Sequence, residues 1–377
     1  MICLHCSYKN PDDAKFCTEC GSTVGVPEQQ SSTEHKLRNA FSDFANKINQ
    51  AAGVETPVEL NLREVFSKVF TRHSEEEAER LFFVGTSHTT PDIDQIVDSW
   101  PKPWLFARIF ALVAFAYFGL YMGLDWYENI NFLPGLITLG SFMVPFTILI
   151  FFWEMNAPQN ISIYKIIKML FVGGVISLVT AVFLYDKIGN SSNVILIGIV
   201  EEVAKLIAVL WFLRGNKYKY VLNGLLVGAA IGTGFAAFES AGYAFQMLMM
   251  GDLELMYTTI FWRGVLAPGG HIVWAALSGA ALCMAKRERK FTLLSLADIR
   301  FLRIFGIVVL LHILWDLPLP FISELPIVQL LLTVISWVIA FAVINSGLKE
   351  ISQLKHQTHM VTESVQEPNQ GYTSLDS

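Results

Sequence analysis

Residues 193–213 have the sequence NVILIGIVEEVAKLIAVLWFL, an apolar run that is interrupted by Glu201, Glu202 and Lys205. A helix that crosses the hydrocarbon core of a bilayer needs about 20 mainly apolar residues, so this run predicts a transmembrane helix. Ionisable side chains inside a membrane are costly, and by default they indicate a functional site. The stretch therefore predicts a bundle of membrane helices and places a candidate site within it.

The composition of the 377-residue chain agrees with this class. Hydrophobic residues make up 53% of the chain and charged residues 16%, whereas soluble domains carry about 25% charged residues. These features exclude a soluble globular enzyme, a disordered chain and a disulfide scaffold. The net charge of −6 is not accompanied by a large basic face, so we predict no nucleic-acid partner.

We predict an all-α polytopic membrane protein, because similar apolar runs recur along residues 104–348. The eight expected transmembrane helices cover residues 104–124, 132–153, 163–185, 193–213, 221–246, 264–285, 302–322 and 325–347. The connections on one side of this bundle hold eleven Lys and Arg residues, and those on the other side hold two. Since the basic side of a membrane protein faces the cytoplasm, both termini are expected to be cytoplasmic.

Four of the five cysteines lie close together near the start of the chain, at Cys3, Cys6, Cys17 and Cys20. Two Cys-x-x-Cys knuckles direct four thiolates at one point, which is typical of a tetrahedral Zn²⁺ site. The stretch resembles a short zinc ribbon. We expect a structural zinc, because four thiolates leave no open coordination position. The alternative is a redox-active dithiol pair.

The chain is expected to divide into five parts. The zinc ribbon covers residues 1–22, and a flexible linker rich in Ser, Gln, Thr and Glu covers residues 23–57. Residues 58–103 carry apolar positions at helical spacing and are expected to form a cytoplasmic subdomain, in which Ser74 begins a helix. The membrane domain covers 104–348, and a disordered cytoplasmic tail covers 349–377.

Ionisable residues occur on four consecutive predicted spans. They are Glu201, Glu202 and Lys205 on the fourth, Glu239 on the fifth, His271 on the sixth, and His312 and Asp316 on the seventh. At 1.5 Å per residue, these positions lie roughly 8–14 Å from the outer face of the membrane. Because unrelated packing residues have no reason to share one depth, we predict that they form one site. Pro268-Gly269-Gly270 is expected to loosen the helix just before His271.

The residue types at this depth favour hydrolysis. Carboxylates and imidazoles together can bind a divalent metal, or they can hold and deprotonate a water directly. We expect Glu201 or Glu202 to be the general base, and His271 and His312 to hold the water or the metal. Asp316 is expected to orient His312 from one turn away. The chain has no Gly-x-Ser-x-Gly, no His-Glu-x-x-His and no paired aspartates of the presenilin type.

The motif series resembles that of the PrsW-family intramembrane proteases, which belong with the CAAX prenyl endopeptidases and the bacteriocin-processing relatives. The motifs are Glu-Glu-x-x-Lys from Glu201, Phe-x-x-x-Glu ending at Glu239, Pro-Gly-Gly-His ending at His271, and His-x-x-x-Asp from His312. The resemblance covers roughly residues 104–348. It implies proteolysis of a membrane-anchored protein, for example an anti-sigma factor, in the bacterial inner membrane. It implies catalytic roles for Glu201, Glu202, Glu239, His271, His312 and Asp316.

Two other classes of function stay open. The same buried charges could form a proton or cation pathway in a secondary transporter, although such a pathway also needs stations in the inner half of the membrane. A non-catalytic membrane receptor could use the zinc ribbon to bind a cytoplasmic protein partner. For single residues the alternative is packing, such as a Glu239–Arg263 ion pair or a His312–Asp316 pair.

Overall fold

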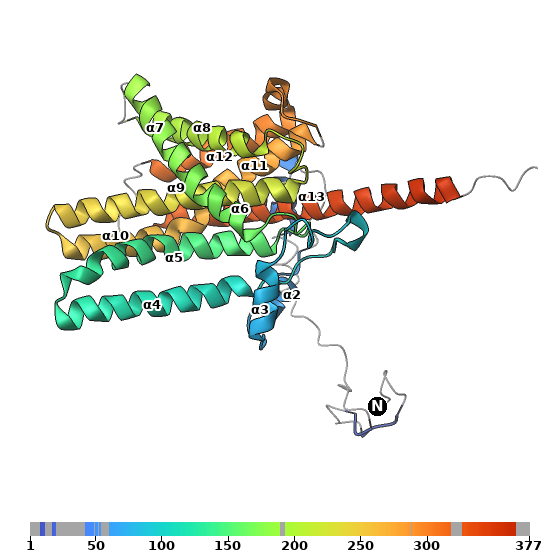
Figure 1. Ribbon diagram of the computed structural model, residues 1–377, viewed down its shortest axis with the longest axis horizontal. Coiled ribbons are helices and arrows are strands. Elements are labelled where there is room, and N and C mark those ends of the chain that lie inside the picture. Colours follow the sequence, from blue (N-terminus) through green and yellow to red (C-terminus); the bar gives the residue numbers. More distant parts are fainter. Residues whose placement is uncertain are drawn as a thin grey trace, which may run out of the picture. The chain divides into compact units, whose positions relative to one another are not determined.

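The structure of the chain is a computed structural model (Figure 1). It describes residues 8–11, 17–19, 42–48, 50–51, 53, 60–188, 193–287, 289–317 and 326–366. Two units separate along the chain, Met1–Lys47 and Ile48–Ser377. Every element bounded in the described part of the second unit is a helix, which confirms the predicted all-α class.

The second unit begins with two short helices, α2 (Leu62–Val65) and α3 (Glu75–Phe82). The bundle that follows is built from α4 (Leu105–Tyr127), α5 (Leu133–Glu154), α6 (Ile163–Lys168), α7 (Gly174–Ile188), α8 (Val194–Leu213), α9 (Val221–Met249), α10 (Leu253–Leu266), α11 (His271–Lys286), α12 (Ile299–Asp316) and α13 (Ile327–Gln366). A π-helical turn, Met169–Gly173, joins α6 to α7.

Six segments of the described chain are long and apolar enough to cross a membrane. They are Leu105–Tyr127, Ile130–Glu154, Ile163–Ile188, Val221–Met249, Leu253–Lys286 and Ile327–Met360. The sequence analysis counted α8 and α12 as two further spans. Each of these helices is at most 20 residues long and includes three charged residues in every stretch of 18, whereas each of the six has such a stretch with two at most. The count of eight therefore stays a prediction.

The centre of the bundle is a close pair of helices, α9 and α11. A Cβ atom on Gly228 would lie 2.0 Å from the carbonyl oxygen of Ala275, and one on Gly224 would lie 2.3 Å from that of Gly279. Glycine at these positions lets the two backbones touch, as small residues do at membrane helix interfaces. This close approach fixes Glu239 and His271 relative to each other.

The predicted break before His271 is also confirmed. A 3₁₀ turn, Ala267–Gly269, separates α10 from α11, and His271 is the first residue of α11. A Cβ atom on Gly269 would lie 1.9 Å from Thr333 Oγ1 of α13, so only glycine fits beneath that helix. The break thus places the His271 imidazole at a helix end inside the bundle.

The last helix is longer than the sequence indicated. α13 continues to Gln366, well beyond the predicted end of the last span at residue 347. The disorder expected from residue 349 onward is therefore wrong as far as Gln366. The segment keeps a helical backbone because its apolar part continues into a stretch of good helix formers without glycine or proline.

The segment before the bundle is joined to it through α4. Ser74 caps α3 in a capping box with Glu77, so the predicted helix start is confirmed.

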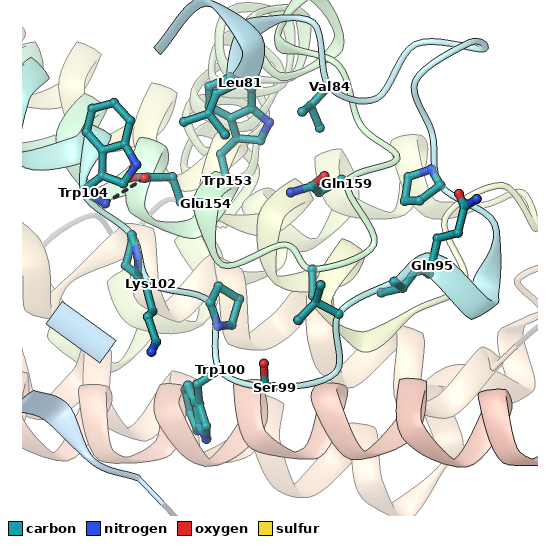
Figure 2. Close-up of a pocket in the computed structure, with 16 residues that line it drawn as sticks. Leu81, Val84, Gln95, Ser99, Trp100, Lys102, Trp104, Trp153, Glu154 and Gln159 are labelled. Atoms are coloured by element: carbon teal, nitrogen blue, oxygen red, sulfur yellow. Dashed lines mark hydrogen bonds between the residues drawn. The ribbon is translucent and has the colours of Figure 1, made fainter. Parts of the chain in front are cut away.

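Glu154, at the end of α5, accepts the backbone N–H groups of Trp104, Leu105 and Phe106 at 2.8, 2.9 and 2.9 Å. Figure 2 shows Glu154 and Trp104 beside a cavity of about 420 Å³. None of the ionisable residues predicted to form the site lines this cavity.

Candidate active site

Four helices bring the predicted site residues together. α8 supplies Glu201, α9 supplies Glu239, α11 supplies His271, and α12 supplies His312 and Asp316. All five side chains line one cavity of about 400 Å³. These residues are far apart in the sequence, and the sequence analysis related them only by a common predicted depth in the membrane. In the structure they line the same cavity.

His312 is 2% exposed, and each of its ring nitrogens faces a carboxylate. Nδ1 lies 2.7 Å from Glu202 Oε1, and Nε2 lies 3.3 Å from Asp316 Oδ2. Because carboxylates only accept hydrogen bonds, a ring protonated on both nitrogens satisfies this arrangement. The two partners fix the ring with Nε2 at 3.6 Å from Glu201 Oε2.

His271 is held between a cation and a carboxylate. Lys205 Nζ lies 2.8 Å from Nδ1, and Glu239 Oε2 lies 3.1 Å from Nε2. An ammonium group has only donors, so Nδ1 accepts from Lys205 while Nε2 donates to Glu239. Glu239 also pairs with Arg263, whose Nε donates to Ser240 Oγ at 2.8 Å. The ion pair considered as a packing alternative for Glu239 is present, together with this contact to His271.

Glu201 has one carboxylate oxygen that faces the histidines. Its Oε2 is buried and has no hydrogen-bond partner among the described residues. This oxygen lies 3.6 Å from His312 Nε2 and 4.0 Å from His271 Nδ1. Ligand atoms of Glu201, His271 and His312 lie within 4.8 Å of one another. Two imidazoles and one carboxylate are a donor set found in catalytic zinc sites, so these residues fit a divalent metal ion once His312 Nε2 has lost its proton and His271 Nδ1 is released from Lys205.

Glu202 occupies a different place from its neighbour. Its side chain is fully buried, does not line the cavity, and pairs with Lys205 as well as with His312 Nδ1. The residues Glu201 and Glu202 are rotated by about 100° around the helix, so one reaches the cavity and the other supports the ring behind it. The structure therefore separates two carboxylates between which the sequence analysis did not distinguish.

The charges of the cluster do not balance when all of its carboxylates are ionised and both histidines are neutral. The acidic side chains are Glu201, Glu202, Glu239 and Asp316, and the permanent cations are Lys205 and Arg263. Excess negative charge is costly inside a membrane protein. Protonated histidines or a bound cation would restore the balance.

Tyr185 is a site residue that the sequence analysis missed. Tyr185 lies near the C-terminal end of α7, and its hydroxyl donates to Glu201 Oε1 at 3.1 Å. A tyrosine near the end of an apolar helix is typical of a membrane interface. Its position in the helix therefore carried no signal of a contact with the carboxylate.

The predicted zinc ligands are described in part. Cys3, Cys6 and Cys20 lie outside the described residues. Cys17 is 3% exposed, and the Nδ2 of Asn10 lies 3.4 Å from its Sγ. The backbone N–H of Thr18 donates to Asn10 Oδ1 at 2.9 Å, which orients the amide toward the sulfur. A buried sulfur that accepts an N–H bond is consistent with the thiolate form that binds zinc.

Two comparisons with protein families give matches. A family model described as PrsW family intramembrane metalloprotease matches residues 128–344, which is more than half of the chain. A model described as a zinc-ribbon domain matches residues 2–24. No curated protein and no solved structure is significantly similar to the chain. The first match contains every residue of the cluster, from Tyr185 to Asp316.

Proposed function

Because the chain belongs to the PrsW family of intramembrane metalloproteases, we propose that it hydrolyses a peptide bond of a membrane-anchored protein at the cluster of Glu201, His271 and His312. One observation carries this proposal. The buried Oε2 of Glu201 lacks a hydrogen-bond partner among the described residues and faces both imidazoles. A water held between these three groups would touch a base and two polarising rings at once.

Glu201 has one of two roles in this proposal. If a divalent ion binds, Glu201, His271 and His312 are its ligands, and the ion supplies a more acidic water and a polarised carbonyl. If no ion binds, Glu201 Oε2 itself removes the proton from the water. The description of the family as metalloproteases supports the first role.

The other residues of the cluster hold these three in place. Glu202 and Asp316 fix the two nitrogens of His312, and Lys205 and Glu239 fix those of His271. We propose that Glu202 and Lys205 are positioning residues, because neither lines the cavity. Glu239 and Asp316 do line it, so they are candidates for contact with the reacting groups.

The substrate we propose is a membrane-anchored protein, for which an anti-sigma factor is an example. The depth predicted for the cluster places the cut near the extracytoplasmic end of the substrate's membrane segment. This location depends on the predicted orientation, with both termini in the cytoplasm of a bacterial cell and the chain in its inner membrane.

The experiment that tests this function uses the purified full chain in liposomes. A panel of single-pass reporter proteins, each tagged at both ends, is added in the same membrane, and the fragments are mapped by mass spectrometry. We expect two fragments, which result from cleavage of a bond near the outer end of the reporter's apolar segment. A failure to cut any reporter, with a folded chain and with divalent metals supplied, would contradict the proposal.

Replacing Tyr185 with phenylalanine should lower kcat for reporter cleavage by about 10-fold, because a hydrogen bond to a charged group contributes about 1.5–3 kcal/mol. The ring stays in place, so the loss should be larger in kcat than in KM, and thermal stability should fall only modestly. The matched control is Tyr164→Phe, whose exposed side chain lies on α6, away from the cluster. An equal change in KM, or no change in kcat, would show that the bond to Glu201 does not serve the reaction.

We also propose that the zinc ribbon holds a structural zinc that does not take part in the chemistry. Cys17→Ser should then release one zinc per chain, as measured by elemental analysis, because a four-thiolate site loses its closed shell. Reporter cleavage should remain within about 2-fold of wild type, since Cys17 belongs to the unit Met1–Lys47 and the cluster belongs to the other unit. Loss of cleavage by a chain whose membrane helices stay folded would contradict this separation.

A further inference from the structure

A second cavity reaches the cluster from the side of α7. It has a volume of about 390 Å³ and lies between α7 and α9, with Glu201 of α8 at its inner wall. Its α7 wall is formed by Leu178, Ala181, Val182 and Tyr185, and its α9 wall by Phe235, Glu239, Gly242, Tyr243 and Gln246. We call this cavity the α7–α9 groove.

The groove exists because the two helices touch at one end and separate at the other. A Cβ atom on Gly174 would lie 2.7 Å from the Cα of Gly234, so the backbones meet there. Two turns further along α9, a Cβ atom on Gly242 would meet nothing within 4 Å. Figure 1 shows α7 running obliquely to α9, in agreement with this divergence.

The groove borders the cavity of the candidate active site. Glu201, Glu239 and Tyr243 line both. A chain lying in the groove would therefore end against the carboxylate whose free oxygen faces the two histidines. The second cavity is not a separate site, because its inner end is the site itself.

The surroundings of the groove are those of a lipid-facing surface. Val179 and Phe183 on α7 are 63% and 57% exposed, within a segment long and apolar enough to cross a membrane. Leu178, Ala181 and Val182 give the groove an apolar wall, while Tyr185 and Gln246 place polar groups at its far end. An unwound peptide in a membrane needs partners for its backbone groups, and such polar side chains can supply them.

We propose that the membrane segment of the substrate enters through the α7–α9 groove and lies against Ala181 and Gly242 while its scissile bond reaches Glu201. This inference rests on the proposed protease function and adds the face by which the substrate arrives. The occupant is an apolar peptide that has locally lost its helical form. Gly242 is the specificity-determining residue, since a Cβ atom there would meet nothing within 4 Å and its small size leaves the space that the peptide fills.

The test is a series of larger side chains at Gly242, namely Gly242→Ala, Gly242→Val and Gly242→Leu. A side chain at this position has room, so the variants should fold. The matched control is Gly119→Leu on α4, where a Cβ atom also meets nothing within 4 Å and which lies outside both cavities. Two substrates are compared in liposomes: a tagged single-pass reporter that the wild-type chain cuts, and a quenched soluble decapeptide that it also cuts.

Cleavage of the reporter should fall stepwise along the series, by about 10-fold or more for Gly242→Leu, as expected when bulk fills an apolar pocket. Cleavage of the decapeptide, which can arrive through the other cavity, should change by less than about 2-fold. Reporter cleavage at the wild-type rate in Gly242→Leu would overturn the inference, and so would an equal loss for both substrates. Glu201→Gln, which should stop both cleavages, tests the protease function separately.

A photo-crosslinking amino acid at Val182 provides an independent measurement on the same face. With the inactive Glu201→Gln chain in liposomes, it should give an adduct with the reporter that Gly242→Leu weakens. An adduct with lipid alone would show that acyl chains occupy the groove, and it would overturn the inference.

Discussion

Replacing Glu201 with glutamine should lower the rate of reporter cleavage by about 10²–10⁴-fold, the range over which a general base contributes. The amide has the shape of the carboxylate and still accepts a hydrogen bond from Tyr185, whose hydroxyl contacts Oε1. It cannot take a proton from water at Oε2 and is a poor metal ligand. The expected result is a folded chain that binds the reporter and barely cuts it, as measured by pull-down and by the rate of fragment release.

The neighbouring carboxylate provides the informative comparison. Glu202→Gln removes the ion-pair partner of Lys205 in a fully buried position. Breaking a buried pair from one side costs about 3–5 kcal/mol, so this variant should lose thermal stability as well as activity. Glu254→Gln, an exposed position on α10, is the control that should change neither quantity. Near-normal cleavage by Glu201→Gln would move the function away from this site.

The membrane class could be predicted because it depends on local composition, and the glycines of α9 indicate a close approach to another helix without indicating which one. Apolar length decides whether a run spans a bilayer, and glycines spaced along one face decide how near a second helix can come. Gly228 is an example, since its neighbour on α11 is the backbone at Ala275. The position of the cluster followed from depth, because helix rise converts residue number into distance.

Which residues of the cluster face the cavity, and which support those residues from behind, could not be predicted from spacing. Adjacent residues on a helix point about 100° apart, and which of them faces the cavity depends on how the whole helix is rotated by its packing. That rotation places Glu201 between the histidines and places Glu202 behind His312. Tyr185 was missed for the same reason, because its contact with Glu201 is set by the packing of α7 on α8.

The helix count and the tail show where composition is ambiguous. α8 and α12 carry charges of the site, and three charged residues within at most 20 positions keep each of them out of the six segments recognised as spans by length and composition. A functional site thus weakens the signal by which its own helices are recognised. The last helix continues to Gln366 because no residue stops it, whereas a change from apolar to polar composition alone does not end a helix.

Replacing His271 or His312 with alanine should each lower cleavage by about 10²–10⁴-fold, and the double variant should lose little more than either single variant. Groups that act on one water behave as a unit, so once one of them has been replaced, replacing a second one causes little further loss of rate. The proximity of both rings to Glu201 Oε2, at 4.0 and 3.6 Å, is the reason to expect one unit.

The same variants decide whether the unit contains a metal, provided that they are made in the Cys17→Ser background, where the ribbon zinc is absent. If Glu201, His271 and His312 hold an ion, this chain should retain one metal per molecule, and either alanine variant should lose it. A chelator should then stop cleavage, and added zinc should restore it. If metal content is zero throughout while cleavage by the unmodified site persists, Glu201 acts on the water directly. The fold-losses in rate of the two histidine variants could instead multiply in the double variant. In that case the two rings do not serve one reaction centre, and the peptide bond is not cut in the cavity between α8, α11 and α12.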